Sequence, residues 1–314
     1  MAVVTNSEKN TANIKFKKSK SEWVIVFERI KRNQIAIVSM YYILLNVFIA
    51  IFFPLIMPYD PKSSAPANID RFGGGAYGRP SLLFPAGTSP VGYDVYSQLL
   101  AGTETSLLIG IFATLISIVI GVTIGLLAGY YKGWVEEVLM RITDLFLTLP
   151  FLIIALILIA AISNGQIPYL SDLSTVQIIT IVIGLFGWAG LARLVTANVK
   201  QVGSLEYVDA IRLIGARDRR IIIVHILPNV LTSIIILSAL LIAGAILSEA
   251  GLAFLGFGDP TTVSWGILVS NGRDKFRSYP EQALIPGFAI FFLVLAINLF
   301  GDAVRDALDP KLKE

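Results

Sequence analysis

The chain has 314 residues, of which 55% are hydrophobic and only 15% are charged, and its mean hydropathy is +0.74. Soluble globular proteins carry about 45–50% apolar and about 25% charged residues, so this composition excludes an ordinary soluble enzyme, a nucleic-acid-binding domain and a disordered protein. With no cysteine and a single histidine, His225, the chain also lacks a disulfide framework, a cysteine nucleophile and a multi-histidine metal site.

Six apolar stretches are long enough to cross a bilayer, and none of them contains Asp, Glu, Lys or Arg. A membrane-spanning helix needs about 20 predominantly apolar residues, and lipid offers the backbone no hydrogen-bond partner. The sequence therefore predicts an all-α integral membrane protein with six transmembrane helices. The stretches cover residues 35–57, 106–131, 145–162, 176–192, 230–248 and 283–301.

The basic residues indicate how these spans are oriented. If the chain is threaded through six spans, the side that holds both termini carries 19 Lys and Arg residues and the opposite side carries six. Cytoplasmic loops of membrane proteins are enriched in Lys and Arg. Both termini are therefore predicted to be cytoplasmic, in a multi-pass protein of the cell (plasma or inner) membrane.

Changes of composition divide the chain into three parts. Residues 1–33 form a basic cytoplasmic tail that ends in a short helix, which either lies in the membrane interface or forms the first turns of the first span. Residues 34–104 hold the first span and a long external loop rich in Gly and Pro. Residues 105–314 form a core of five spans.

Two features inside the spans bear on helix packing. Gly121, Gly125 and Gly129 recur every four residues, a spacing that lets a neighbouring helix approach closely. Polar side chains in the spans are expected mainly to bond neighbouring helices, with a minority facing a pore. These residues are Asn46, Thr114, Ser117, Thr180, Ser233, Ser238 and Asn298.

The segment 205–230 between the fourth and fifth spans is the most informative part of the sequence. Tyr207, Ile211 and Ile214 recur at helical spacing and form one apolar stripe, with Val208 beside it. Gly215 follows the last apolar position, where a left-handed helix cap favours glycine. A second helix is expected to begin near residue 218 and to stop near Pro228.

This pattern supports two readings of the segment. A two-sided helix held by tight turns at the membrane face is a suitable docking element for a soluble partner. The plainer alternative is a solvated connector. Asp209 and Arg212 stand three residues apart with opposite charges, as expected for the polar edge of a short helix.

The same residues resemble the EAA loop of ABC-importer permeases, a motif written E-A-A-x3-G-x9-I-x-L-P. Asp209-Ala210, Gly215 and Leu227-Pro228 stand at its spacing, although Asp209 replaces the usual Glu and Ile211 the second alanine. The string His225-Ile226-Leu227-Pro228-Asn229 is similar to the C-type subunit of the dipeptide/oligopeptide subfamily. Further matches cover about residues 22–312, in order along the chain.

The resemblance implies a type I ABC-importer permease fold with a cytoplasmic coupling helix. It also implies a heterodimer with a homologous second permease subunit, two cytoplasmic ABC ATPase subunits and an extracytoplasmic solute-binding protein. ATP and Mg would be bound by the ATPase subunits, and this chain would bind no cofactor and act as a transport subunit, not as an enzyme. In agreement, the sequence holds no G-x-x-x-x-G-K-[ST] phosphate loop.

The resemblance assigns the docking of the ATPase to the coupling loop 199–229. The residues so assigned are Glu206, Tyr207, Asp209, Ala210, Ile211, Arg212, Ile214, Gly215, Leu227 and Pro228. Within this set, Ile211 and Ile214 are expected to be the apolar anchors. Peptides are the solutes implied by the subfamily; oligosaccharides or nickel are the alternatives, and a secondary carrier or channel is a more remote one.

Overall fold

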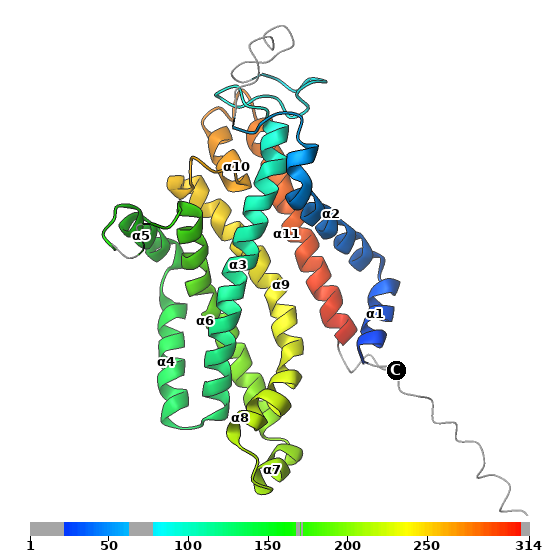
Figure 1. Ribbon diagram of the computed structural model, residues 1–314, viewed down its shortest axis with the longest axis vertical. Coiled ribbons are helices and arrows are strands. Elements are labelled where there is room, and N and C mark those ends of the chain that lie inside the picture. The colour runs from blue at the N-terminus through cyan, green and yellow to red at the C-terminus, as the bar shows by residue number, and fades with distance from the viewer. Residues whose placement is uncertain (1–21, 63–77, 168–169, 171, 309–314) are drawn as a thin grey trace, which may run out of the picture.

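The computed structural model describes residues 22–62, 78–167, 170 and 172–308 (Figure 1). Regular structure within these residues is helical, apart from an isolated bridge between Thr88 and Asp94. The α-helices are α1 (Glu22–Arg32), α2 (Gln34–Ile56), α3 (Val95–Tyr130), α4 (Trp134–Thr148), α5 (Phe151–Ser163), α6 (Thr175–Gly203), α7 (Glu206–Leu213), α8 (Asp218–Arg220), α9 (Leu227–Leu252), α10 (Trp265–Arg273) and α11 (Glu281–Leu308). Two π-helical turns, η3 (Ile221–Ile226) and η4 (Ala253–Phe257), precede and follow α9.

Five helical segments are long and apolar enough to cross a membrane. They are α2, α3, α6, the continuous segment Asp218–Phe257 and α11. A sixth crossing comes from α4 and α5 if this bent pair is counted as one span. The predicted all-α membrane architecture is therefore confirmed, with the third span built differently from the expectation.

The third span is not the single helix predicted over residues 145–162. The chain turns by 89° between α4 and α5, and Leu149 there has an extended backbone. The cause is Pro150, which lacks an N–H and disfavours the helical conformation in the residue before it. The longer helix of the bent pair is α4. It starts at Trp134, in the stretch between the second and third predicted spans that was expected to be a loop.

Charged residues on α4 explain why its apolar character is weak in the sequence. Asp144 forms an ion pair with Arg193 of α6, and Glu136 forms one with Lys200 of the same helix. Both basic partners lie on α6, which continues to Gly203, beyond the expected end of its span and past the start of the predicted coupling loop at residue 199. Charges on two neighbouring helices thus neutralise one another.

Helix α3 also extends further than predicted. It begins at Val95, so the boundary placed between residues 104 and 105 falls inside a continuous helix. Asp94 caps it by accepting hydrogen bonds from the backbone N–H groups of Tyr96 and Ser97. At 1.5 Å per residue its 36 residues are about 54 Å long, well beyond the hydrocarbon thickness of a bilayer.

The first helix is separate from the first span. α1 ends at Arg32, and the side chain of Asn33 caps α2 by accepting hydrogen bonds from Ile35 and Ala36. The guanidinium of Arg29 donates to the carbonyl of Ala307, at 3.1 Å, and so ties α1 to α11. Residues 1–21 of the predicted tail lie outside the described part of the chain.

The three glycines spaced four residues apart lie on the face of α3 that contacts α6. A Cβ atom at Gly121 would lie 2.8 Å from the carbonyl oxygen of Trp188, and one at Gly125 would lie 2.5 Å from the Cβ of Val195. At Gly129 the corresponding distance, to the Cβ of Val199, is 2.6 Å. The two helices are in contact along a seam that leaves no room for larger side chains.

We expect Gly125→Leu to destabilise the subunit by about 1–3 kcal/mol, because the added side chain overlaps Val195 and forces α3 away from α6. Thermal unfolding of the purified protein in detergent measures the effect. Gly190→Leu is the matched control, since a Cβ at Gly190 of α6 meets nothing within 4 Å. Equal stability of the two variants would contradict the close-packed seam.

Candidate functional site

Helix α7 projects from one end of the helix bundle, opposite α10 and the loop around residues 78–94 (Figure 1). It ends in the turn predicted at Gly215, whose φ is +82°. The Ala216 N–H donates to the carbonyl of Ile211 at 3.3 Å, and the Gly215 N–H donates to that of Arg212 at 3.0 Å. This pair of bonds is a Schellman motif, which stops the helix and sends the chain back towards the membrane.

The apolar residues of α7 are divided between two faces. Val208 is fully buried against a cluster from α6, η3 and α9, and Ile211 is half-buried against the same cluster. Leu213 and Ile214 are 88% and 83% exposed, and Tyr207 is 41% exposed. Ile211 therefore packs mainly against the subunit's own core and offers a partner less surface than Leu213 or Ile214.

Leu213 is the outward-facing residue that the sequence reasoning missed. Leu213 lies off the apolar stripe formed by positions 207, 211 and 214, so the helical spacing does not single it out. The sequence feature that indicates its exposure is its position directly before Ile214 and two residues before the glycine cap. Two adjacent, exposed, branched apolar side chains at the tip of a helix form a compact patch that water disfavours.

Polar contacts connect α7 to the end of α3 and to the start of α8. Arg212 pairs with Asp209 at 3.0 Å, and its guanidinium lies over the ring of Tyr130 at 5.7 Å. The Tyr130 hydroxyl in turn donates to Asp218 at 2.7 Å. Exposed ion pairs add little stability, so the burial of Val208 contributes more than these contacts to the position of α7.

Pro228 does not end a helix, contrary to the prediction. Residues from Asp218 to Phe257 form one continuous helical segment, with Pro228 near the start of α9. The Leu227 N–H bonds to the carbonyl of Ile222, five residues earlier, in the π-helical turn η3. This wider turn accommodates the proline ring within the helix. Of the other predicted residues, Glu206 and Ala210 are exposed and Leu227 is half-buried.

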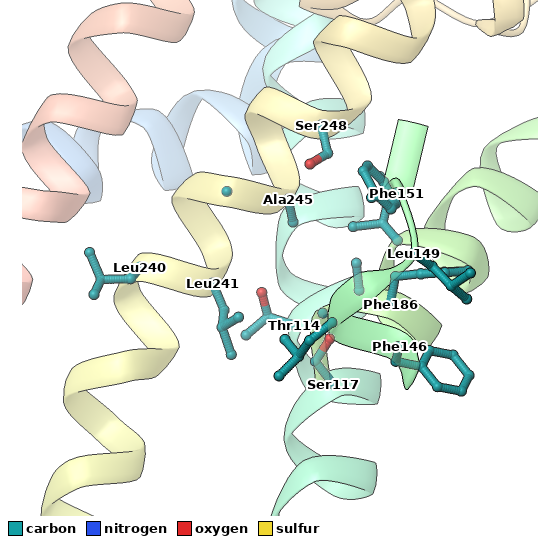
Figure 2. A pocket seen from close by; sticks show the side chains of 15 residues that line it. Thr114, Ser117, Phe146, Leu149, Phe151, Phe186, Leu240, Leu241, Ala245 and Ser248 are labelled. Atoms are coloured by element: carbon teal, nitrogen blue, oxygen red, sulfur yellow. The ribbon is translucent and has the colours of Figure 1, made fainter. Parts of the chain in front are cut away.

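A cavity of about 330 Å³ lies within the membrane part of the bundle, where the α4–α5 bend faces α3, α6 and α9 (Figure 2). Phe146, Phe151 and Phe186 form one wall, in which the ring centroid of Phe186 lies 5.4 Å from that of Phe146 and 5.8 Å from that of Phe151. Figure 2 shows Thr114 and Ser117 facing this space on the side of α3. No charged residue lines it.

Two observations mark the cavity as a place for a polar occupant. The buried hydroxyl of Thr114 has no hydrogen-bond partner among the described residues. Leu149 also lines the space, and both it and the adjacent Pro150 have an extended, non-helical backbone. At membrane depth such backbone is tolerated only where it is buried in protein or lies beside water. Unpaired polar groups in hydrocarbon are costly, so these groups favour a wet or ligand-filled chamber.

The opposite end of the bundle is built around α10. Ser264 caps this helix and donates to buried Glu249 of α9 at 2.6 Å, while the indole N–H of Trp265 donates to the Leu99 carbonyl of α3 at 2.9 Å. Near it, burial raises the pKa of Asp259, but hydrogen bonds from Thr261 and Thr262 outweigh it and leave that pKa below its usual value. This carboxylate is thus held charged in the loop before α10.

Comparisons with known proteins identify the family. Residues 121–314 match the family described as "Binding-protein-dependent transport system inner membrane component", and residues 21–73 match the "N-terminal TM domain of oligopeptide transport permease C". The chain is 35% identical, over 96% of its length and 95% of the relative's, to the glutathione transport system permease protein GsiD of Pectobacterium atrosepticum. It is 34% identical, over 94% and 92%, to the protein of the same name from Escherichia coli.

Solved structures support the same fold. A chain of the MetNI methionine ABC transporter, in an inward-facing conformation, superposes with a TM-score of 0.57 and 16% identity, over 68% of this chain and 96% of that chain. A second crystal form of that transporter gives a TM-score of 0.55. With most of its length matched by one family and nearly all of it aligned to curated relatives, this chain belongs to the binding-protein-dependent transport system inner membrane components, as a permease subunit of an ABC importer.

Proposed function

We propose that this permease carries small peptides of two to a few residues into the cell. Two curated relatives that are 35% and 34% identical to it are named as glutathione transport system permeases, and glutathione is a tripeptide. The membrane cavity supports this solute class, because it offers hydroxyl groups for a peptide backbone and phenyl rings for apolar side chains. Oligosaccharides and nickel remain the alternative solutes for machinery of this kind.

The energy for transport is proposed to enter through α7. Leu213 and Ile214 form an apolar tip with no cover from this subunit, which suits insertion into a groove of a cytoplasmic ATPase subunit. Val208 and the Schellman turn join that tip rigidly to α6 and α9, and α9 lines the cavity. Movement of the ATPase would thus be passed to the walls of the cavity.

The remaining partners follow from the same proposal. Two ATPase subunits would bind ATP and Mg, a homologous second permease subunit would complete the pore, and an extracytoplasmic binding protein would deliver solute at the α10 end. Basic residues gather where helices end near α7: Lys132 follows α3, Lys200 is in the last turn of α6, Arg212 is on α7, and Arg217, Arg219 and Arg220 follow α7 in the chain. By the positive-inside rule this end, with both termini, faces the cytoplasm.

Uptake by the reconstituted importer tests the proposal. The permease pair, its ATPase subunits and its binding protein are placed in vesicles, and entry of labelled glutathione, a labelled disaccharide and nickel is compared. We expect peptide entry that requires ATP and the binding protein. Peptide entry driven by a proton or sodium gradient without the ATPase would contradict it, and disaccharide or nickel entry alone would reassign the solute.

A further inference from the structure

A second pocket lies at the α7 end of the bundle, apart from the membrane cavity and from the exposed tip of α7. It has a volume of about 420 Å³ and forms where α3 and α6 end, α4 begins and α7 passes. Its walls include Tyr130, Tyr131, Lys132, Trp134, Lys200 and Arg212. The charged side chains that line it are all cations, and no carboxylate lines it.

The three cations are available to an incoming anion. Lys132 makes no ion pair within the described part of the chain. Lys200 pairs with Glu136, and Arg212 pairs with Asp209, but these pairs are partly or largely exposed to solvent. Exposed pairs of this kind contribute about 0–1 kcal/mol, so an anion with several oxygens can compete for both cations.

The aromatic residues place the pocket at the depth of the lipid headgroups. Trp134 is 76% exposed and Tyr131 is 38% exposed, and both follow directly on the end of α3. Trp and Tyr with free surface at the ends of spans lie at the membrane–water interface. In contrast, Trp188 within α6 and Trp265 at the start of α10 are buried in the bundle.

One lining residue connects the pocket to the coupling segment. Arg212 belongs to α7, and its guanidinium lies over the ring of Tyr130, 5.7 Å from the centroid. An anion held between Lys132, Lys200 and Arg212 would therefore contact the turn after α3, the last turn of α6, and α7 together. Such a contact adds a restraint between α7 and the ends of the two spans beside it.

We propose that this pocket binds the phosphate of an anionic phospholipid headgroup from the cytoplasmic leaflet, and that the bound lipid holds α7 in the orientation that engages the ATPase. The proposal rests on the proposed function for the role of α7 and for the sidedness of the membrane. Basic pockets between transmembrane helices on this side are suited to anionic headgroups. The importer's coupling thereby depends on the charge of the surrounding lipid.

Vesicle composition tests the proposal in the complete importer. Solute-stimulated ATP hydrolysis is measured in phosphatidylcholine vesicles as the share of phosphatidylglycerol is raised to about one third. We expect stimulation to rise with phosphatidylglycerol, and Lys132→Gln to need about fivefold more of it, as loss of one basic contact near the surface implies. Arg219→Gln, an exposed cation at the same end outside the pocket, should respond as the unmodified chain does.

Three further readings separate the possible outcomes. Native mass spectrometry of the complex should find fewer retained phosphatidylglycerol molecules with Lys132→Gln than with Arg219→Gln; equal retention and an equal response would overturn the proposal. Stimulation by inorganic phosphate in phosphatidylcholine would assign the pocket to a soluble anion instead of a lipid. Weaker ATPase assembly of Lys132→Gln in every lipid would assign it to an acidic side chain of the ATPase.

Failure of the proposed function would look different from failure of the lipid site. If the chain were not driven by an ATPase, solute would stimulate no ATP hydrolysis in any vesicle, with or without the Lys132 substitution. If only the lipid site were wrong, stimulation would be present and insensitive to phosphatidylglycerol.

Discussion

Replacing Leu213 and Ile214 together with Ala is expected to lower ATP-driven solute uptake by at least about thirtyfold, because central apolar anchors of a protein interface are each worth about 2 kcal/mol or more. Both side chains lie almost wholly outside the subunit's own core. Surface substitutions of this kind change folding stability by about 0.5 kcal/mol or less. The variant should therefore insert and fold normally while the ATPase loses its hold on the permease.

Three measurements on the same preparation check this expectation: uptake into vesicles, solute-stimulated ATP hydrolysis, and co-purification of the ATPase with the permease. The matched control is Ile223→Ala with Val224→Ala, an adjacent pair of exposed apolar residues on η3, outside the tip of α7. Normal uptake by the Leu213/Ile214 variant, or equal losses in both variants, would remove α7 from the coupling role.

Ile211→Ala separates this role from mere stability of the segment. Ile211 packs against the cluster that contains Val208, so its truncation should lower the thermal stability of the subunit. The assembled importer should nevertheless stay coupled at temperatures where the subunit is folded. The sequence pattern predicts that Ile211 and Ile214 are both apolar anchors for the ATPase; only the three-dimensional packing distinguishes them.

The sequence predicted the features that depend on short-range rules. The apolar lengths indicated five of the crossings, the period of 3.6 indicated α7, and the position of Gly215 indicated a left-handed cap. Each of these follows from the backbone's own preferences or from its transfer into lipid. They require no knowledge of which helix lies beside which.

The features that the sequence did not predict depend on neighbours. The charges of α4 disguised a membrane crossing, because their basic partners are on α6, a neighbour that the residue pattern does not reveal. Pro228 looked like a helix end, since the wider π-helical turn that accommodates it is not visible in a residue pattern. The sequence shows Thr114 and Ser117 as polar residues within a span, but the bend at Pro150 is what opens a cavity beside them.

Closing that cavity from within should stop transport without unfolding the subunit. Gly244 of α9 lines the cavity, and a Cβ atom there would meet nothing within 4 Å. Gly244→Phe therefore places a phenyl ring in or beside the open space, and its Cβ atom overlaps no neighbour. The substitution also removes a glycine, a residue that disfavours helices. We expect uptake to fall by at least about tenfold, a loss that corresponds to about 1.4 kcal/mol added to the limiting step.

The comparison that makes this result specific uses Gly251→Phe, at a second open position on the same helix that does not line the cavity. That variant should keep uptake, and both variants should keep the ATPase bound, because α7 is unchanged in each. The chain's lack of cysteine allows an independent check. Thr114→Cys should react with a water-soluble thiol reagent. Leu115→Cys should not, because Leu115 lies on the outer, apolar surface of the spanning helix α3, which lipid covers. A path through this cavity requires the cavity to be both wet and unobstructed. Full uptake by Gly244→Phe together with an unreactive cysteine at position 114 would therefore show that solute passes elsewhere.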